Sequence, residues 1–291
     1  MRTSDAAAIR EHLLRLRGEP VLPPEASVVI PINARKDLIN VLQIIGDITA
    51  YQGKHRLEIV LVINNYHPNS PPKEIEEFRA LGLVVLAIPK LLVPRETIFS
   101  ARIPGVRAAS SEKTIHFDAD CRVPHATHLI DWYIEQFDRG AQLAYTYVGY
   151  YDLPTSLSSK VWIMIHRAFR WFKRVILRIP VSRGSNYAVI RSLILHLYDK
   201  GWLSYDIKVG TMIKSIGGKI SYSGEKNLMV LTSGRNFRGN WKESFEYTAW
   251  RMGYYRRLAP LRPDADYLKE DSLTVDHENV VTTSVVPPKS G

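Results

Sequence analysis

KTIHFDAD, at residues 113–120, joins a short strand-like run to a pair of carboxylates. The run up to Phe117 has the length and composition of a buried strand, and Asp118 and Asp120 follow it with one residue between them. Both acids would then lie in one loop at the edge of a sheet. Such a loop is either a turn with two solvated acids or a site for a divalent cation, because Mg²⁺ and Mn²⁺ prefer oxygen ligands.

The residues before this stretch alternate between apolar runs and segments with helical spacing. We expect strands at 27–31, 58–63, 83–88 and 113–117, and helices at 37–51, 73–81 and 97–110. Pro104 must lie near the start of the last of these helices or kink it. Strands that are almost continuously apolar and alternate with helices indicate a mainly parallel sheet covered on both faces.

Ligands of such sheets bind beyond the carboxyl ends of the strands. Asn33, Asn64 and Asp118 all follow predicted strands at that edge. This common position favours a metal site at Asp118 and Asp120 over a solvated turn.

The second half of the chain has a more mixed pattern. We expect helices at 125–138, 157–178, 192–200, 206–216 and 242–257, and strands at 142–151, 185–190, 218–223 and 228–231. The helix at 242–257 carries many aromatic residues, most of which we assign to packing, and the polar tail at 278–291 is predicted to be disordered.

Composition narrows the class of protein. Of 291 residues, 45% are apolar and 23% charged, which is ordinary for a globular protein. A single cysteine, Cys121, excludes a disulfide framework and a cysteine-rich zinc site, and it fits a reducing compartment. The charged, amphipathic residues 1–17 lack the apolar core of a secretory signal, and no apolar run is long enough to span a bilayer, so we expect a cytoplasmic location. The net charge of +10 favours a polyanionic partner: nucleic acid, an anionic membrane or a phosphate-bearing substrate.

Four pieces of the chain, in order, resemble the family-2 glycosyltransferases. They are SVVIP at 27–31, EIVLVINN at 58–65, ARIPGVRAASSEKTIHFDAD at 101–120, and GSNYAVIRS at 184–192 followed by YDIKVGTMIKSIGGKISY at 205–222. The resemblance covers roughly residues 26–235. It implies an α/β fold of the GT-A type, with a mainly parallel Rossmann-like sheet flanked by helices, a mixed acceptor-side half and a helical C-terminal extension.

The same resemblance implies a division of the chain. Residues 1–25 would be an N-terminal helix and lead-in, 26–122 the nucleotide-sugar-binding half, 123–235 the acceptor-binding half of the same GT-A domain, 236–277 a helical extension and 278–291 a disordered tail.

Residue roles follow from the matched motifs. Asp118 and Asp120 match the family's metal and diphosphate motif, and Asp206 matches its catalytic base. The residues implied to bind the nucleotide sugar are Pro31, Asn33, Asn64, Arg102, Asp118, Ala119, Asp120 and Arg235. The chain departs from the family pattern at Asn33-Ala34, Asn64, Pro104 and Tyr205.

Two of these residues have a simpler explanation. Asp206 opens a helical pattern, where aspartate is favoured as an N-cap, and only the resemblance favours the base. Arg235, in the glycine-containing stretch after the last strand, would either clamp a diphosphate or lie in a solvated basic turn.

The helix at 157–178 has apolar residues on one broad face and cations on the other. Membrane contact would involve Trp162, Arg167, Arg170, Trp171, Lys173 and Arg174. The commoner explanation of such a pattern is a helix that packs its apolar face on the core and leaves its basic face in solvent.

The expected function is that of an inverting glycosyltransferase that uses a UDP- or GDP-sugar and Mg²⁺ or Mn²⁺. The acceptor would be a hydroxyl, on a lipid or glycan if the protein is peripheral on the inner membrane face. A sugar nucleotidyltransferase is disfavoured because residues 31–37 contain no glycine. The remaining alternative is a non-catalytic or degenerate GT-A protein that binds membrane or nucleic acid through its basic surface; no nucleic-acid-binding motif is recognisable, so nucleic acid is the weaker partner.

Overall fold

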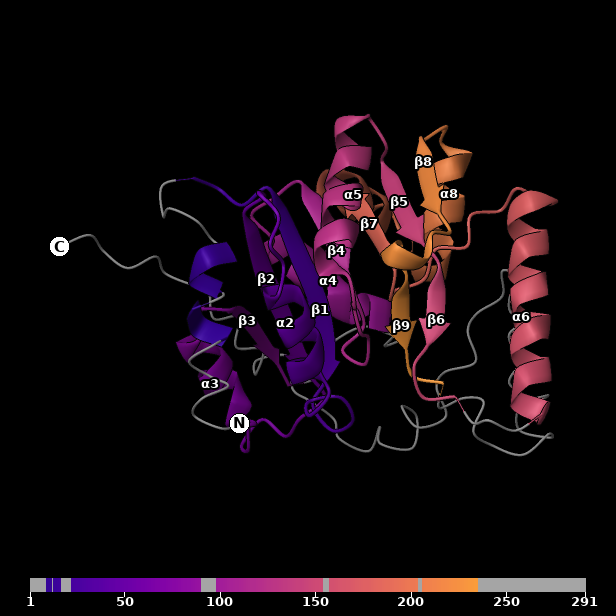
Figure 1. Cartoon of the computed structure of the whole chain (residues 1–291). Helices are drawn as coiled ribbons and strands as arrows, with labels where there is room; N and C mark the ends of the chain where they lie inside the picture. The colour runs from indigo at the N-terminus through magenta and orange to yellow at the C-terminus, as the bar shows by residue number, and fades with distance from the viewer. Residues whose placement is uncertain are drawn as a thin grey trace.

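The computed structural model describes residues 9–11, 13–16, 22–89, 98–153, 157–203 and 206–234 (Figure 1). Arg235, the predicted helix at 242–257, the extension at 236–277 and the tail at 278–291 lie outside the described residues. The N-terminal helix begins the described part, and its Leu13 and Leu16 are buried in the core.

The first half of the chain forms a parallel sheet, as its apolar runs predict. The strands β1 (Ala26–Asn33), β2 (Leu57–Asn64), β3 (Val84–Ile88) and β4 (Lys113–His116) lie side by side in the order β3-β2-β1-β4. Every residue of β2 is buried, and every residue of β1 except the last, which explains the lack of polar alternation in these runs.

The second half adds three strands to the same sheet. Strand β7 (Tyr187–Ile190) lies between β4 and β5 (Leu143–Thr146) and is antiparallel to both, and β8 (Ile220–Ser223) is parallel to β5. The order over the described residues is therefore β3-β2-β1-β4-β7-β5-β8. A sheet that is mainly parallel in one half and mixed in the other confirms the predicted fold class.

The predicted strand at 142–151 is wrong as a single element. It divides at Tyr147 into β5 and a separate strand β6 (Val148–Tyr150). β6 leaves the main sheet and pairs in parallel with β9 (Val230–Thr232), whose first residue donates its N–H to the carbonyl of Tyr147. The 3-10 turn η2 (Lys226–Leu228) occupies the start of what the sequence predicts as the strand at 228–231.

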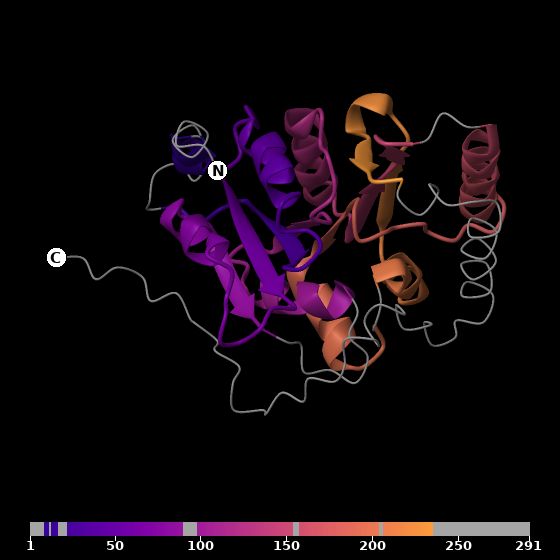
Figure 2. The ribbon, with the colours of Figure 1, turned by 90° about the horizontal axis from the view of Figure 1, so that it is seen from below.

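Helices cover both faces of the main sheet (Figure 2). Val28 and Ile30 of β1 point to one core, with α2 (Val41–Thr49), α3 (Glu74–Ala80) and α5 (Ala126–Asp138). Val29 points to the other core, with α4 (Ile98–Ala108), α7 (Arg191–Asp199) and α8 (Val209–Ser215). The alternation of neighbouring residues between the two cores is the pleat of a strand that is buried on both sides.

Helix α4 lies unusually close to the sheet. A Cβ added at Gly105 would lie 2.7 Å from side-chain carbons of both Val29 and Val62, so only glycine permits this approach. Pro104 lies in the second half of α4 and the helix continues to Ala108, so of the two expectations a position near the helix start is wrong, while a kink stays a prediction. Arg102 lies on the same helix, three residues before Gly105, and contacts the carbonyl of Phe117 just after β4.

Helix α6 (Leu157–Val175) is drawn apart from the main sheet, beyond β6 and β9 (Figure 1). Within the described residues, no helix has both the length and the apolar character needed to cross a bilayer.

Candidate active site at the carboxyl edge of the sheet

Strand β4 ends directly before the two candidate metal ligands. The Phe117 N–H donates to the carbonyl of Val29 (3.3 Å), and the Cys121 N–H closes a turn on the Asp118 carbonyl (3.0 Å). The far side of the loop is held by Asp47 of α2, which accepts hydrogen bonds from Arg122 Nε (2.8 Å) and from the Val123 N–H (2.8 Å). The loop is therefore anchored on both sides of the acids.

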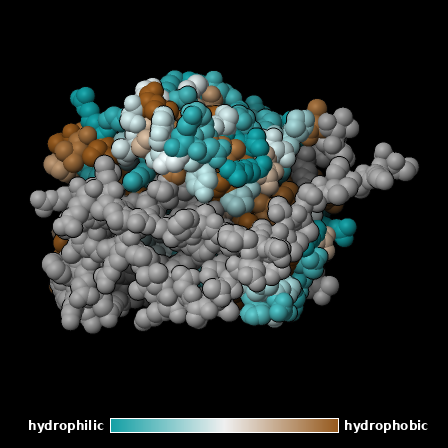
Figure 3. All heavy atoms as spheres, turned by 180° about the vertical axis from the view of Figure 1, so that it is seen from behind, coloured by the Kyte–Doolittle hydropathy of each residue, from teal (hydrophilic) through white to brown (hydrophobic). Residues whose placement is uncertain are grey.

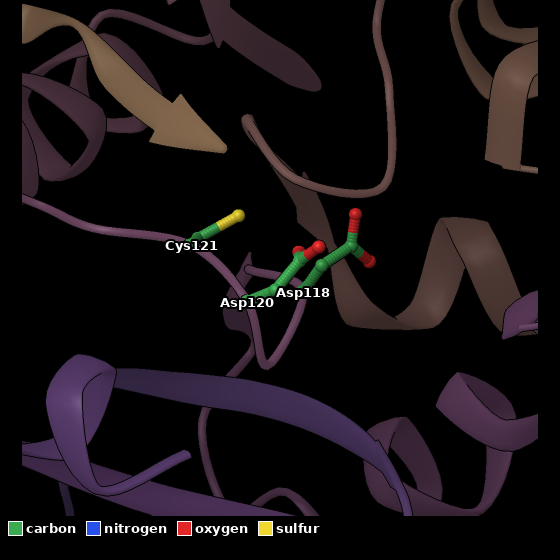
Figure 4. Close-up of side chains that lie close together, drawn as sticks. All are labelled: Asp118, Asp120 and Cys121. Atoms are coloured by element: carbon green, nitrogen blue, oxygen red, sulfur yellow. The ribbon is translucent and has the colours of Figure 1, made fainter. Parts of the chain in front are cut away.

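Asp118 and Asp120 present their carboxylates on one side of this loop (Figure 4). One ligand atom from each, together with Cys121 Sγ, lies within 4.8 Å of the others. A cation with metal–oxygen distances of about 2.0–2.6 Å can bridge two oxygens at such a separation. The donor set therefore fits a divalent cation.

Cys121 is a neighbour of the site that the sequence does not single out. Burial raises the pKa of its thiol well above the ordinary value, so the sulfur is a neutral thiol rather than a thiolate. Two carboxylates and a neutral thiol match Mg²⁺ or Mn²⁺ better than a thiolate-binding metal. The sequence feature that could have predicted Cys121 at this site is its position directly after Asp120.

Arg102 forms an ion pair with Asp118. Its side chain is fully buried, donates from Nη1 to the Phe117 carbonyl (3.2 Å) and pairs through Nη2 with Asp118 Oδ1. The sequence predicted that Arg102 lines the nucleotide, but the arginine has no exposed surface for a direct contact. Its described contacts are with the loop itself, so it orients the Asp118 carboxylate.

The surroundings of Asp118 favour the protonated form of its carboxyl group. Burial raises the pKa of Asp118 to about 7, Arg102 opposes the rise, and the charges of Asp120, Asp206 and Asp37 add to it. Asp37, in the turn after β1, was not predicted as part of the site. A group of carboxylates around one half-buried acid is an arrangement that a divalent cation would stabilise.

Asp206 lies close enough to this group for its charge to act on Asp118. Its Oδ2 accepts the Gly184 N–H (2.8 Å) and its Oδ1 accepts the Ile207 N–H (2.7 Å). It lies in the 3-10 turn η1 (Asp206–Lys208), while α8 begins only at Val209 with Lys208 as its N-cap and no side-chain cap bond. The capping explanation for Asp206 therefore fails for α8.

Gly184 lies between Asp206 and Arg102. A methyl group at this position would be 2.4 Å from Asp206 Oδ2 and 2.4 Å from Arg102 Nη2. The structure thus brings together Arg102, Asp118 and Asp206, which are widely separated in the sequence, and it requires a residue without a side chain between them.

The two strand-end asparagines lie next to each other. Asn33 pairs in register with Asn64, and Asn33 Oδ1 accepts hydrogen bonds from Asn65 Nδ2 (3.2 Å) and the Arg35 N–H (3.1 Å). Asn64 is buried, and its Oδ1 has no hydrogen-bond partner among the described residues. Pro31 and Ala119 are also buried. Of these predicted nucleotide contacts, Asn33 has the most accessible side chain.

The end of strand β9 contacts Asp120. Thr232 Oγ1 donates to Asp120 Oδ1 (3.4 Å), and Asp152 holds the next two residues by accepting bonds from Ser233 Oγ (2.7 Å) and the Gly234 N–H. Arg235 follows Gly234 directly in the sequence and lies outside the described residues.

The predicted membrane-contact residues of α6 turn partly toward the body of the protein. Arg170 and Arg174 lie over the rings of Tyr147 and Tyr222, 5.2 and 4.0 Å from the ring centroids, and Lys173 is buried. The side chain of Trp162 lies outside the described residues. Apolar side chains of this segment are exposed instead: Leu157, Met164, Ile165, Trp171, Phe172, Val175, Ile176 and Leu177. Seen from behind, the molecule has a group of apolar atoms at its left edge (Figure 3). The predicted packing of the apolar face on the core is therefore wrong, while membrane contact stays a prediction.

Comparison with known proteins shows the fold. No protein-family model matches the chain, and no curated protein matches its sequence. Among solved structures, it is similar to the mannosyltransferase PcManGT from Pyrobaculum calidifontis in complex with GDP-Man and Mn²⁺, with 16% identity and a TM-score of 0.53 over 93% of this chain and 74% of that one. It is also similar to GalNAc-T7 with UDP, GalNAc and Mn²⁺, with 16% identity and a TM-score of 0.51 over 74% of this chain and 44% of that one, so it spans less than half of that protein. With the sheet order described above, these likenesses show that the chain has the GT-A fold of nucleotide-sugar glycosyltransferases.

Proposed function

We propose that this protein is a glycosyltransferase that moves a sugar from a UDP- or GDP-linked donor to an acceptor hydroxyl, with inversion at the anomeric carbon. The observation that carries the proposal is the pair Asp118 and Asp120, held on an anchored loop at the carboxyl edge of a GT-A sheet. The two similar structures contain Mn²⁺ together with GDP-Man or UDP, which supports a divalent metal and a nucleotide donor here.

Asp118 and Asp120 would hold Mg²⁺ or Mn²⁺ against the donor diphosphate. When bound, the cation supplies positive charge that stabilises the departing nucleoside diphosphate. Arg102 keeps Asp118 oriented, and Thr232 does the same for Asp120. Arg235 remains our candidate for a direct contact with the phosphates.

Asp206 is the candidate base. The acceptor oxygen would form a bond to the anomeric carbon while the bond between that carbon and the diphosphate oxygen breaks, and the acceptor proton would pass to Asp206. Two backbone N–H groups, of Gly184 and Ile207, orient its carboxylate. Attack and departure from opposite faces of the sugar would invert the anomeric carbon.

The remaining assignments divide the domain into two halves. Asn33 and Asn64 would recognise the base and ribose in the half at 26–122, and Pro31 and Ala119 would also contact the nucleotide sugar. The half at 123–235 would bind the acceptor. This division and a cytoplasmic location remain predictions.

A thermal-shift screen tests the proposal. At a concentration of about one hundred times its dissociation constant, a donor should stabilise the protein by about 2.7 kcal/mol and raise the melting temperature by about 5–10 °C. The rise should require Mn²⁺ and a nucleoside diphosphate or its sugar, and it should vanish in EDTA. Nuclear magnetic resonance of the product then reports the anomeric configuration. If no nucleotide sugar stabilises the protein or is consumed in the presence of Mn²⁺, the protein is a degenerate member of the fold.

Metal binding should depend on pH because Asp118 has a raised pKa of about 7, against an ordinary value of 3.8. Below pH 7 a proton must leave before this carboxylate can bind metal, so we expect Mn²⁺ affinity to fall by up to about tenfold per pH unit. The stability of the metal-free protein depends on pH in the opposite direction. Protonated Asp118 stabilises the folded state, and this contribution is lost as the pH rises through 7. Calorimetric Mn²⁺ titrations at pH 6, 7 and 8, in buffers of different ionisation enthalpy, count the released protons. A constant affinity without proton release would contradict this prediction.

A further inference from the structure

A cavity of about 570 Å³ lies between α6 and the strands β5, β6 and β8. Its volume is within the range of roughly 300–1,000 Å³ that is typical of small-molecule sites. Five cationic side chains line it: Arg167, Arg170, Arg174, Arg183 and Lys226. No acidic side chain is among the described residues that line it. The walls therefore carry a concentrated positive charge.

The arginines are arranged over aromatic rings. Arg167 and Arg170 lie 5.9 and 5.2 Å from the centroid of Tyr147, and Arg174 lies 4.0 Å from the centroid of Tyr222. Aromatic faces hold guanidinium groups in place without neutralising their charge. This arrangement departs from the usual orientation of an amphipathic helix, since Arg170, Lys173 and Arg174 of α6 are buried or half-buried while many of its apolar residues are exposed. Gathered cations repel one another, so the cavity favours an anion.

Arg183 provides an independent sign of a missing partner. Its Nε–H is buried and has no hydrogen-bond acceptor among the described residues. A buried donor without an acceptor is costly, so this position favours a bound acceptor that the described residues do not supply. The guanidinium fork of arginine suits phosphate oxygens in particular.

The cavity adjoins the candidate active site along two segments of chain. Arg183 precedes Gly184, whose N–H binds Asp206, and neighbouring Cα atoms are about 3.8 Å apart. On the other side Val148 lines the cavity and pairs with Val230 of β9, two residues before the Thr232 that contacts Asp120. The cavity is thus next to the candidate base, whereas the donor phosphates would lie at Asp118 and Asp120.

We propose that this cavity binds a phosphate or diphosphate group of the acceptor, placing the acceptor hydroxyl near Asp206. The role as acceptor site rests on the proposed function, whereas the binding of a phosphate group does not. The tyrosines and Trp171 would pack against an apolar or sugar portion of the same molecule. The source of the phosphate is a soluble phosphorylated compound or a lipid headgroup, which share this chemistry.

Calorimetric binding of phenyl phosphate to the full chain in EDTA tests the site without metal or donor. Wild type should bind saturably, and Arg174→Gln and Arg183→Gln should each raise the dissociation constant by at least about tenfold. Arg139→Gln, which removes an exposed arginine paired with Glu135, is the matched control and should bind like wild type. Asp120→Asn should also bind like wild type, because the metal ligands are not part of the cavity.

Three outcomes would overturn the proposal: no saturable binding by wild type, unchanged binding by both cavity variants when circular dichroism shows them folded, or loss of binding in Asp120→Asn. The assay does not use sugar transfer, so a failure of the proposed function leaves its result intact. Sedimentation with phosphatidylcholine vesicles, with and without phosphatidic acid, identifies the source. Capture that requires phosphatidic acid and is lost in Arg174→Gln supports a lipid phosphate, and phenyl phosphate binding without capture supports a soluble acceptor. If all variants sediment equally with the vesicles and none binds phenyl phosphate, the protein adsorbs to the membrane through its general surface charge and the proposed cavity site is wrong.

Discussion

Asp120→Asn is expected to reduce metal-dependent sugar transfer by at least about a thousandfold, which corresponds to about 4 kcal/mol of lost transition-state stabilisation. The amide has nearly the shape of the carboxylate, and it can still accept the Thr232 hydroxyl. It cannot supply the negative charge that holds a divalent cation against a diphosphate. The variant should therefore keep its fold and lose its metal. Turnover of the donor, with Mn²⁺ binding measured in parallel by electron paramagnetic resonance, checks both statements.

Asp199→Asn is the matched control for this change. It removes the same charge from an exposed aspartate that pairs with Arg107 at the end of α7. Such surface pairs contribute little, so activity and metal affinity should stay at the wild-type values. An Asp120→Asn enzyme with full, Mn²⁺-dependent activity would remove the basis of the proposed mechanism.

The sheet of the first half could be predicted because its signal is local. Strands buried on both faces are mostly apolar, and helices separate parallel strands, so the runs at 27–31 and 58–63 could be recognised from their composition. The division of the run at 142–151 could not be recognised in this way. Its tyrosine-rich residues suit a strand throughout, and the break at Tyr147 depends on β9, which is distant in the sequence.

The candidate site was predictable to the same extent. Asp118 and Asp120 follow a strand directly, so their position came with the strand. The contacts of Arg102 did not, because the pairing of this residue with Asp118 depends on how α4 packs on the sheet. The helical wheel of α6 separated its two faces correctly but could not say which face turns inward.

Gly184 shows most directly how the folded structure adds information to the motif. The sequence places this glycine before a strand, where a flexible turn would be an ordinary explanation. Its φ is not among the positive values found at Gly82, Gly140, Gly201 and Gly217, so the backbone would accept alanine. What excludes alanine is space, since the added methyl would be 2.4 Å from both Arg102 Nη2 and Asp206 Oδ2.

Gly184→Ala is therefore expected to lower kcat by about a hundredfold and to destabilise the fold by about 1–3 kcal/mol. Arg102 is fully buried and cannot move aside, so Asp206 must shift and lose the Gly184 hydrogen bond that orients it. Gly46→Ala is the control: nothing lies within 4 Å of the added methyl in α2, and alanine should stabilise that helix by up to about 1 kcal/mol at unchanged kcat. Steady-state kinetics and thermal unfolding of the two variants measure these effects. The same substitution should therefore have opposite effects on stability at the two glycines. A Gly184→Ala enzyme with the wild-type kcat would show that the orientation of Asp206 does not matter, and the candidate base would then have to be another residue.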